Sequence, residues 1–127
     1  MPNYLIVALG SAFGGALRYW ISGAVQKIFP SILPYGTLSV NIIGSFIVGF
    51  IIFFFDTREL ISQELKLFLT IGLCGGFTTF SAFSFETINL VRDSEYLFAI
   101  INICSNFMLT FFAILLAYYL SKILSGM

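Results

Sequence analysis

A run of hydroxyl-bearing and aromatic residues directly follows a glycine pair inside an apolar stretch of the chain. The pair is Gly75-Gly76, and residues 77–86 read Phe-Thr-Thr-Phe-Ser-Ala-Phe-Ser-Phe-Glu. Because glycine and β-branched threonine are poor formers of an uninterrupted helix, we predict a helix that is broken near its middle. At membrane depth, non-helical backbone is tolerated only where it is buried in protein or lines a polar path. The break therefore predicts an ion or small-solute site, although a glycine pair can also serve close helix packing alone.

A second polar pattern lies near the C-terminus. Asn102, Asn106 and Thr110 are four residues apart, so that they share one face of a helix. One buried asparagine commonly hydrogen-bonds a neighbouring helix, whereas three polar groups along about 12 Å of helix, at 1.5 Å per residue, indicate a track for a polar solute. We favour the track and keep helix–helix hydrogen bonding as the alternative.

Other polar residues also fall within apolar segments. Arg18 shares a helix face with Gly10 and Gly14, which form a small-xxx-small contact pattern. A charge within a span marks function by default, but an arginine near a helix end can also extend to the lipid headgroups. Asn41 is either a functional residue or a helix–helix hydrogen-bonding group. Glu86 is either a capping or solvated carboxylate, or a functional charge that pairs with Arg18 or lies at the entrance of a site.

Length and composition limit the class of protein. The chain has 127 residues, of which 59% are hydrophobic and 9% charged, with a net charge of zero. A helix that crosses the hydrocarbon takes about 20 residues. We therefore predict an all-α membrane protein, a single unit over residues 1–127 with spans at about 4–25, 35–55, 65–90 and 96–120. The N-terminus lacks the basic region of a signal peptide, so the first span is expected to be retained.

Enzyme chemistry and nucleic-acid binding find little support in the residue types. Histidine is absent, there is no basic run, and Cys74 and Cys104 lack metal-ligand spacing. No nucleophile has a plausible base, so we expect no enzyme activity. A small proton-coupled multidrug-type exporter with four transmembrane helices is the main rival, but it would use a titratable carboxylate within a span. A structural or assembly protein is a third possibility that leaves the polar residues unexplained.

The phenylalanines after the glycine pair point to an anion. Phe80 and Phe83 are three residues apart on one helix face, and the edge of an aromatic ring carries the positive part of its quadrupole. A small hydrated anion also needs hydroxyl and amide donors to replace its lost water. Carbonyl groups exposed at residues 75–78 would instead suit a hard cation.

These motifs resemble those of the Fluc (CrcB) fluoride channels of bacteria, archaea and some eukaryotes, over nearly the whole chain. The resemblance is carried by Gly10-xxx-Gly14-xxx-Arg18-Tyr19, by residues 36–44 (GTLSVNIIG) and by residues 75–86 (GGFTTFSAFSFE). It implies a four-helix subunit that forms an antiparallel, dual-topology homodimer with two fluoride pores in the cell (plasma or inner) membrane. Such a channel exports cytoplasmic fluoride passively.

The resemblance also implies roles for individual residues. The pore would be lined by Asn41, Phe80, Phe83, Ser84, Asn102, Asn106 and Thr110. Arg18 would lie in the vestibule. A structural sodium ion at the dimer centre would be held by the backbone carbonyls of Gly75 and Thr78. The fourth segment is where the sequence departs most from other members of the family.

The loop charges are consistent with two orientations in the membrane. With the N-terminus inside, Arg58, Lys66 and Lys122 would be cytoplasmic, and Lys27 and Arg92 would be external. This difference is too small for the positive-inside rule to select one orientation. We therefore expect both orientations to insert and to pair as an antiparallel dimer.

Overall fold

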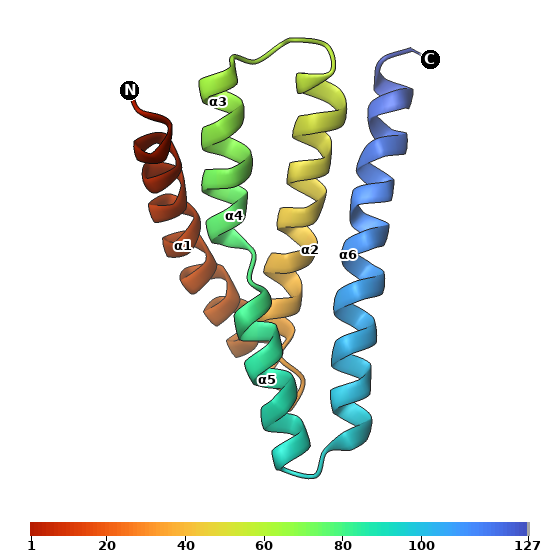
Figure 1. The fold of residues 1–127 in the computed structure, drawn as a ribbon. Coiled ribbons are helices and arrows are strands. Elements are labelled where there is room, and N and C mark those ends of the chain that lie inside the picture. The colour runs from red at the N-terminus through yellow and green to blue at the C-terminus, as the bar shows by residue number, and fades with distance from the viewer. Residues whose placement is uncertain (127) are drawn as a thin grey trace.

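The structure is a computed structural model that describes residues 1–126, and helices account for nearly all of this range (Figure 1). In chain order the elements are α1 (Asn3–Ile28), α2 (Tyr35–Phe50), the π-helical turn η1 (Ile51–Asp56), α3 (Gln63–Leu67), the π-helical segment η2 (Phe68–Cys74), α4 (Gly75–Phe77), α5 (Phe80–Arg92) and α6 (Tyr96–Leu124). Because η1 continues α2, and η2 joins α3 to α4, the chain folds as a small bundle of long, mostly antiparallel helices.

Four helical stretches are long and apolar enough to cross a membrane, which confirms the prediction of an all-helical protein with four membrane helices. They are Asn3–Ile28, Tyr35–Asp56, Gln63–Arg92 and Tyr96–Leu124. Their ends lie within a few residues of the predicted bounds. The largest difference is at the end of α6, which continues to Leu124 because no proline or glycine stops the helix before Gly126.

Helical geometry is interrupted for two residues between α4 and α5. Thr78 (φ −92°, ψ 159°) and Thr79 (φ −152°, ψ 123°) are both extended, and Figure 1 shows this open segment between the two green helices. Gly75 and Gly76 themselves belong to α4. The Thr79 hydroxyl accepts a hydrogen bond from the Ala82 amide (3.1 Å), which caps the start of α5.

Glycines bring α1 into backbone contact with η2 and α4. A Cβ atom on Gly14 would overlap the carbonyl oxygen of Leu73, and one on Gly10 would lie 2.9 Å from the Cα atom of Gly72. A Cβ atom on Gly76 would lie 2.7 Å from the carbonyl oxygen of Ser11. The small residues thus let the two helices approach more closely than larger side chains would allow.

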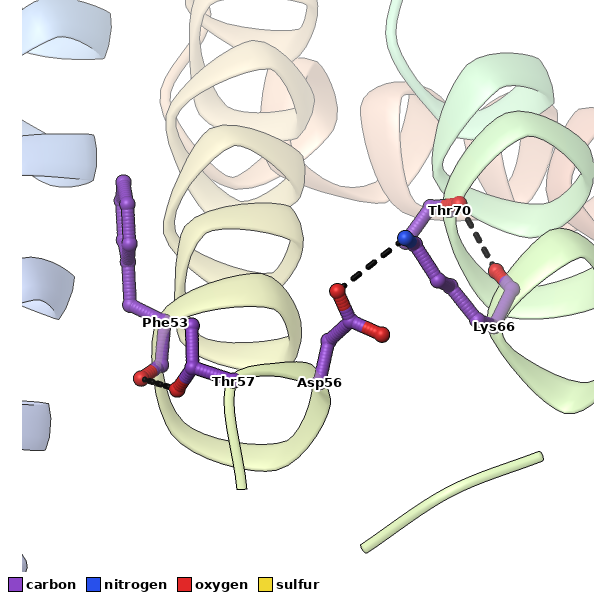
Figure 2. Close-up of polar contacts among 5 residues, drawn as sticks. All are labelled: Phe53, Asp56, Thr57, Lys66 and Thr70. Carbon is purple, nitrogen blue, oxygen red and sulfur yellow. Dashed lines mark hydrogen bonds and ion pairs between the residues drawn. The ribbon is translucent and has the colours of Figure 1, made fainter. Parts of the chain in front are cut away.

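Polar contacts fasten the turn between η1 and α3 (Figure 2). Lys66 of α3 forms an ion pair with Asp56 of η1 (3.0 Å), and both side chains are partly exposed. The Thr57 hydroxyl donates to the carbonyl oxygen of Phe53 (2.7 Å), and the Thr70 hydroxyl donates to that of Lys66 (2.7 Å). A partly exposed ion pair contributes about 0–1 kcal/mol, so these contacts order the turn more than they stabilise the bundle.

Candidate functional site

A cavity of about 390 Å³ lies beside the interruption, between α2, the η2–α4 segment, α5 and α6. Its polar lining consists of two side-chain amides (Asn41 and Asn106) and of the hydroxyls of Ser45, Thr70, Thr78, Thr79 and Thr110. Its aromatic lining consists of Phe80, Phe83, Phe107 and Phe111. No charged side chain of residues 1–126 lines it. Such a cavity offers neutral hydrogen-bonding groups and ring edges to a small solute.

Asn41 holds the extended segment directly. Its Nδ2 donates to the carbonyl oxygen of Thr79 (3.1 Å), and its Oδ1 accepts from the Thr79 amide (2.8 Å). These two bonds satisfy both backbone groups of a residue that has left the helix, which a membrane interior requires. The same Nδ2 also donates to Oδ1 of Asn106 (3.2 Å). Asn41 therefore connects α2 to the interruption and to α6.

The polar face of α6 is hydrogen-bonded within the bundle. Asn106 donates from Nδ2 to the carbonyl oxygen (2.9 Å) and to Oδ1 (3.1 Å) of Asn102. Asn102 donates in turn to the Thr87 hydroxyl of α5 (2.9 Å). Thr110 donates to the carbonyl oxygen of Asn106 (2.6 Å), one turn before it in the same helix. Only Asn106 and Thr110 of the predicted three-residue track line the cavity.

Four phenylalanines meet edge to face or tilted at one side of the cavity. The Phe80 and Phe83 rings have centroids 5.3 Å apart at an interplanar angle of 60°, and Phe107 meets them at 6.5 Å and 5.9 Å. Phe107 also packs edge to face against Phe111 (6.1 Å). Phe83 is buried, whereas Phe80 is 68% exposed in the single chain. The cluster thus presents ring edges to the cavity, and Phe80 forms an exposed rim of it.

Arg18 contacts the α4 side of the interruption and not the cavity. Its Nε donates to the carbonyl oxygen of Gly76 (3.0 Å), an oxygen near the C-terminal end of the η2–α4 helix. A guanidinium at this end also interacts favourably with the helix dipole. The structure therefore places Arg18 where it supports the interruption, and Arg18 is not among the residues that line the cavity.

Three backbone carbonyls at the interruption have no hydrogen-bond donor within residues 1–126, those of Gly75, Phe77 and Thr78. Of these three residues, Gly75 and Thr78 line the cavity. Carbonyl oxygens of this kind are ligands that a hard cation prefers. The same range contains no group of three or more His, Cys, Asp or Glu side chains that could hold a metal ion.

Ser84 and Glu86 lie outside this cavity. Ser84 is partly buried on α5 and is not among the residues that line it. Glu86 lines a second, polar cavity of about 380 Å³ between α1, the loop at residues 29–34, α2 and α5. Its Oε2 accepts from the Thr37 hydroxyl (3.0 Å), and its Oε1 is buried without a hydrogen-bond partner in the described chain.

Sequence reasoning gave no role to Phe107 and Phe111, which line the cavity, or to Thr87, which accepts the Asn102 hydrogen bond behind it. It singled out the Thr79 hydroxyl but not the hydrogen bonds between the Thr79 backbone and Asn41. Phe107 and Phe111 directly follow Asn106 and Thr110 in the sequence, so the same spacing contained a signal for both. No spacing pattern indicates Thr87, since its partner is on another helix.

Comparison with known proteins relates the whole arrangement to one family. The protein named fluoride-specific ion channel FluC of Methylocella silvestris is 45% identical over 84 residues, which cover 65% of this chain and 64% of that relative. The protein of the same name from Clostridium novyi is 52% identical over 80 residues, covering 63% of this chain and 62% of the relative. The one from Shewanella halifaxensis is 49% identical over 84 residues, covering 66% and 67%.

The match therefore spans slightly less than two thirds of the length of the first two relatives. A model of the family described as CrcB-like protein, Camphor Resistance (CrcB), matches residues 5–118. Since that range takes in all four membrane helices and the cavity between them, the chain belongs to the CrcB family.

Proposed function

We propose that the protein is a fluoride-selective ion channel that exports cytoplasmic fluoride passively and so protects the cell from fluoride toxicity. The observation that carries this proposal is the cavity lined by amides, hydroxyls and phenylalanine edges, with no charged side chain of residues 1–126 in its lining. Amide and hydroxyl donors replace the water that a small anion loses, and ring edges add weak electropositive contacts. Relatives in the same family are named as fluoride-specific channels.

Passive flow is sufficient for export. Fluoride enters acid-exposed cells as HF, dissociates in the cytoplasm and is trapped there as an anion. A negative-inside potential of 100 mV then favours its exit by about 2.3 kcal/mol per charge. The four membrane helices support a multi-pass protein, and we place it in the cell (plasma or inner) membrane.

A proton-coupled exporter is less well supported. Such a transporter needs a carboxylate that titrates in the substrate site. Glu86 is the carboxylate nearest the middle of the Gln63–Arg92 span. It lines the second cavity and not the one with the phenylalanines. Proton coupling at the proposed site would therefore have no titratable group of its own.

The proposed assembly is an antiparallel, dual-topology homodimer with two pores. Phe80 and Phe111, both at the rim of the cavity, are each 68% exposed in the single chain. A second copy that covers this rim would close the cavity into a pore. A two-fold dimer would make the two pores equivalent.

A structural sodium ion at the dimer centre is the proposed cofactor. The carbonyl oxygens of Gly75 and Thr78, the two residues with unpaired carbonyls that line the cavity, fit a hard cation, which would satisfy backbone groups that have no other partner in residues 1–126. Replacing sodium by N-methylglucamine should then lower the unfolding temperature of the purified dimer. An unfolding temperature that is indifferent to sodium would count against this ion.

The test of the proposed function is fluoride efflux from liposomes that contain the purified protein. A fluoride electrode should record rapid efflux once a potassium ionophore removes the charge imbalance, and a parallel chloride electrode should record almost none. Liposomes without protein give the leak. Equal fluoride and chloride efflux would reject fluoride selectivity. Fluoride efflux no faster than the leak would reject channel activity.

A further inference from the structure

We infer that Asn102 is a positioning residue of the pore, which acts through Thr87 to hold α5 in register with α2 and α6 and does not contact the permeating ion. This inference rests on the proposed function, because it concerns the placement of the proposed pore residues Phe80 and Phe83. It assigns Asn102 a role different from that of Asn106, its neighbour one turn away.

Burial separates Asn102 from the ion path. Its side chain is 3% exposed, and it is absent from the lining of the cavity that contains Asn41, Asn106 and Thr110. Thr87, which accepts its hydrogen bond, is 6% exposed and also absent from that lining. The pair therefore lies behind the cavity wall and between α5 and α6.

The hydrogen bonds form one chain that runs in a single direction. Asn41 donates to Asn106 (3.2 Å), Asn106 donates to Asn102 (3.1 Å), and Asn102 donates to Thr87 (2.9 Å). The chain ends where the Thr87 hydroxyl donates to the carbonyl oxygen of Phe83 (2.8 Å). We call these four side chains the amide relay.

This direction fixes the orientation of the Asn102 amide. Flipping it would set its Nδ2 against the Nδ2 of Asn106, and its Oδ1 could accept from Thr87 only if that hydroxyl gave up its bond to the Phe83 carbonyl. Successive bonds of the same sense also polarise one another. The relay thus begins at Asn41, which is hydrogen-bonded to the backbone of Thr79, and ends at the backbone carbonyl of Phe83.

A positioning role and an ion-binding role predict opposite results when both partners are made apolar. Removing one partner of a buried hydrogen bond leaves the other unsatisfied, whereas replacing both by apolar groups of similar shape is nearly neutral. Thr87→Val orphans the Nδ2 of Asn102. Adding Asn102→Leu removes that unpaired donor. It also removes the Oδ1 that accepts from Asn106, but Asn106 keeps its bond to the backbone carbonyl of residue 102 and lines the cavity, where its second Nδ2 hydrogen can bond water or the ion.

The experiment compares Thr87→Val, Thr87→Ser, Asn102→Leu and the double variant Thr87→Val/Asn102→Leu by fluoride efflux and by unfolding temperature. Thr87→Val should reduce efflux per folded dimer about tenfold. One buried donor without an acceptor shifts the equilibrium away from the conducting arrangement of α5 by about that factor. Thr87→Ser keeps the hydroxyl and should conduct like the wild type. The double variant should return to within about threefold of wild-type efflux, with a higher unfolding temperature than Thr87→Val.

The control is Ser105→Ala, which removes a partly buried hydroxyl of α6 that lines neither cavity and has no side-chain hydrogen bond in the described chain. It should change neither measurement. A double variant that regains its unfolding temperature while its efflux stays as low as that of Thr87→Val would overturn the inference, because the amide would then be needed at the ion. A double variant that fails to fold would overturn it too.

Failure of the proposed function gives a different result. If the wild-type protein conducts no fluoride, the channel proposal fails, but unfolding temperatures of the same four variants still test the relay. Rescue of Thr87→Val by Asn102→Leu would then support the positioning role within the fold. Strictly additive losses of stability at the two positions would overturn it.

Discussion

At Asn41, every hydrogen-bonding atom of the side-chain amide has a partner within the chain. Its two Nδ2 hydrogens are taken by Thr79 and Asn106, and its Oδ1 accepts from the Thr79 amide. An anion that binds Asn41 must therefore exchange with one of these partners. The bond to Thr79 satisfies a backbone carbonyl that has left the helix, so the bond to Asn106 is the one that we expect an anion to replace.

Asn41→Asp should impair both stability and conduction. The new carboxylate would keep the bond from the Thr79 amide but face the Thr79 carbonyl and the Asn106 Oδ1 with oxygen instead of a donor. We expect a loss of about 1–3 kcal/mol in the free energy of unfolding, and fluoride efflux blocked by like-charge repulsion where water is scarce. Thermal unfolding and electrode efflux measure the two effects, with Asn3→Asp at the exposed start of α1 as the matched control. Normal efflux from Asn41→Asp would place Asn41 outside the ion path.

Phe80→Ile should separate ring chemistry from packing. Isoleucine keeps an apolar side chain at the rim of the cavity but has no electropositive edge, so fluoride efflux should fall about tenfold or more while the dimer stays folded. Phe85→Ile on the same helix is the control, since Phe85 is equally exposed (68%) and does not line the cavity. Efflux from Phe80→Ile that equals that of the control would remove Phe80 from the pore.

Among the elements, α1 and the η2–α4 segment form the tightest contact. Gly10 and Gly14 of α1 meet Gly72 and the backbone at residue 73, so that two main chains touch with little side chain between them. In lipid, where association of helices draws little on the hydrophobic effect, such packing and the Arg18–Gly76 hydrogen bond are what hold α1 to the interrupted helix.

Two adjacent glycines of α1 allow a matched test of this contact. Gly14→Ala should destabilise the protein by about 1–3 kcal/mol, because its Cβ would overlap the backbone of Leu73 and force the helices apart. Gly15→Ala has nothing within 4 Å of its Cβ and should be neutral or stabilising by about 0.5–1 kcal/mol. Unfolding in detergent measures both. Equal effects at the two positions would show that the close contact is not stabilising.

The elements were largely predictable from sequence, and their lateral contacts were not. Hydropathy over windows of about 20 residues is a local property, so the four membrane helices follow from it directly. The glycine pair indicated the region of the interruption, but the extended residues are Thr78 and Thr79, and the backbone of Thr79 is held by Asn41 on another helix. Likewise, spacing grouped Asn102 with Asn106 and Thr110, whereas burial against α5 removes Asn102 from the cavity lining.

For the whole molecule, the proposed antiparallel dimer requires both orientations to insert. With the N-terminus inside, three basic loop residues would be cytoplasmic and two external, a difference too small for the positive-inside rule to select one orientation. Adding three lysines directly after Met1 should force one orientation and abolish fluoride efflux, because no antiparallel partner would be available. Co-expression with a variant biased the other way should restore it. Full activity from the lysine-tagged chain alone would falsify the antiparallel dimer.

The side-chain hydrogen bonds on either side of the interruption have a consequence for the single subunit in the bilayer. Arg18 binds the Gly76 carbonyl, and Asn41 binds both backbone groups of Thr79, and all of these partners belong to one chain. A solitary subunit should therefore keep the interruption in its helix before it pairs with an oppositely oriented copy in the proposed dimer. Dilution of the protein in liposomes should accordingly yield dormant, folded monomers whose activity returns when the membranes are fused and the subunits concentrated.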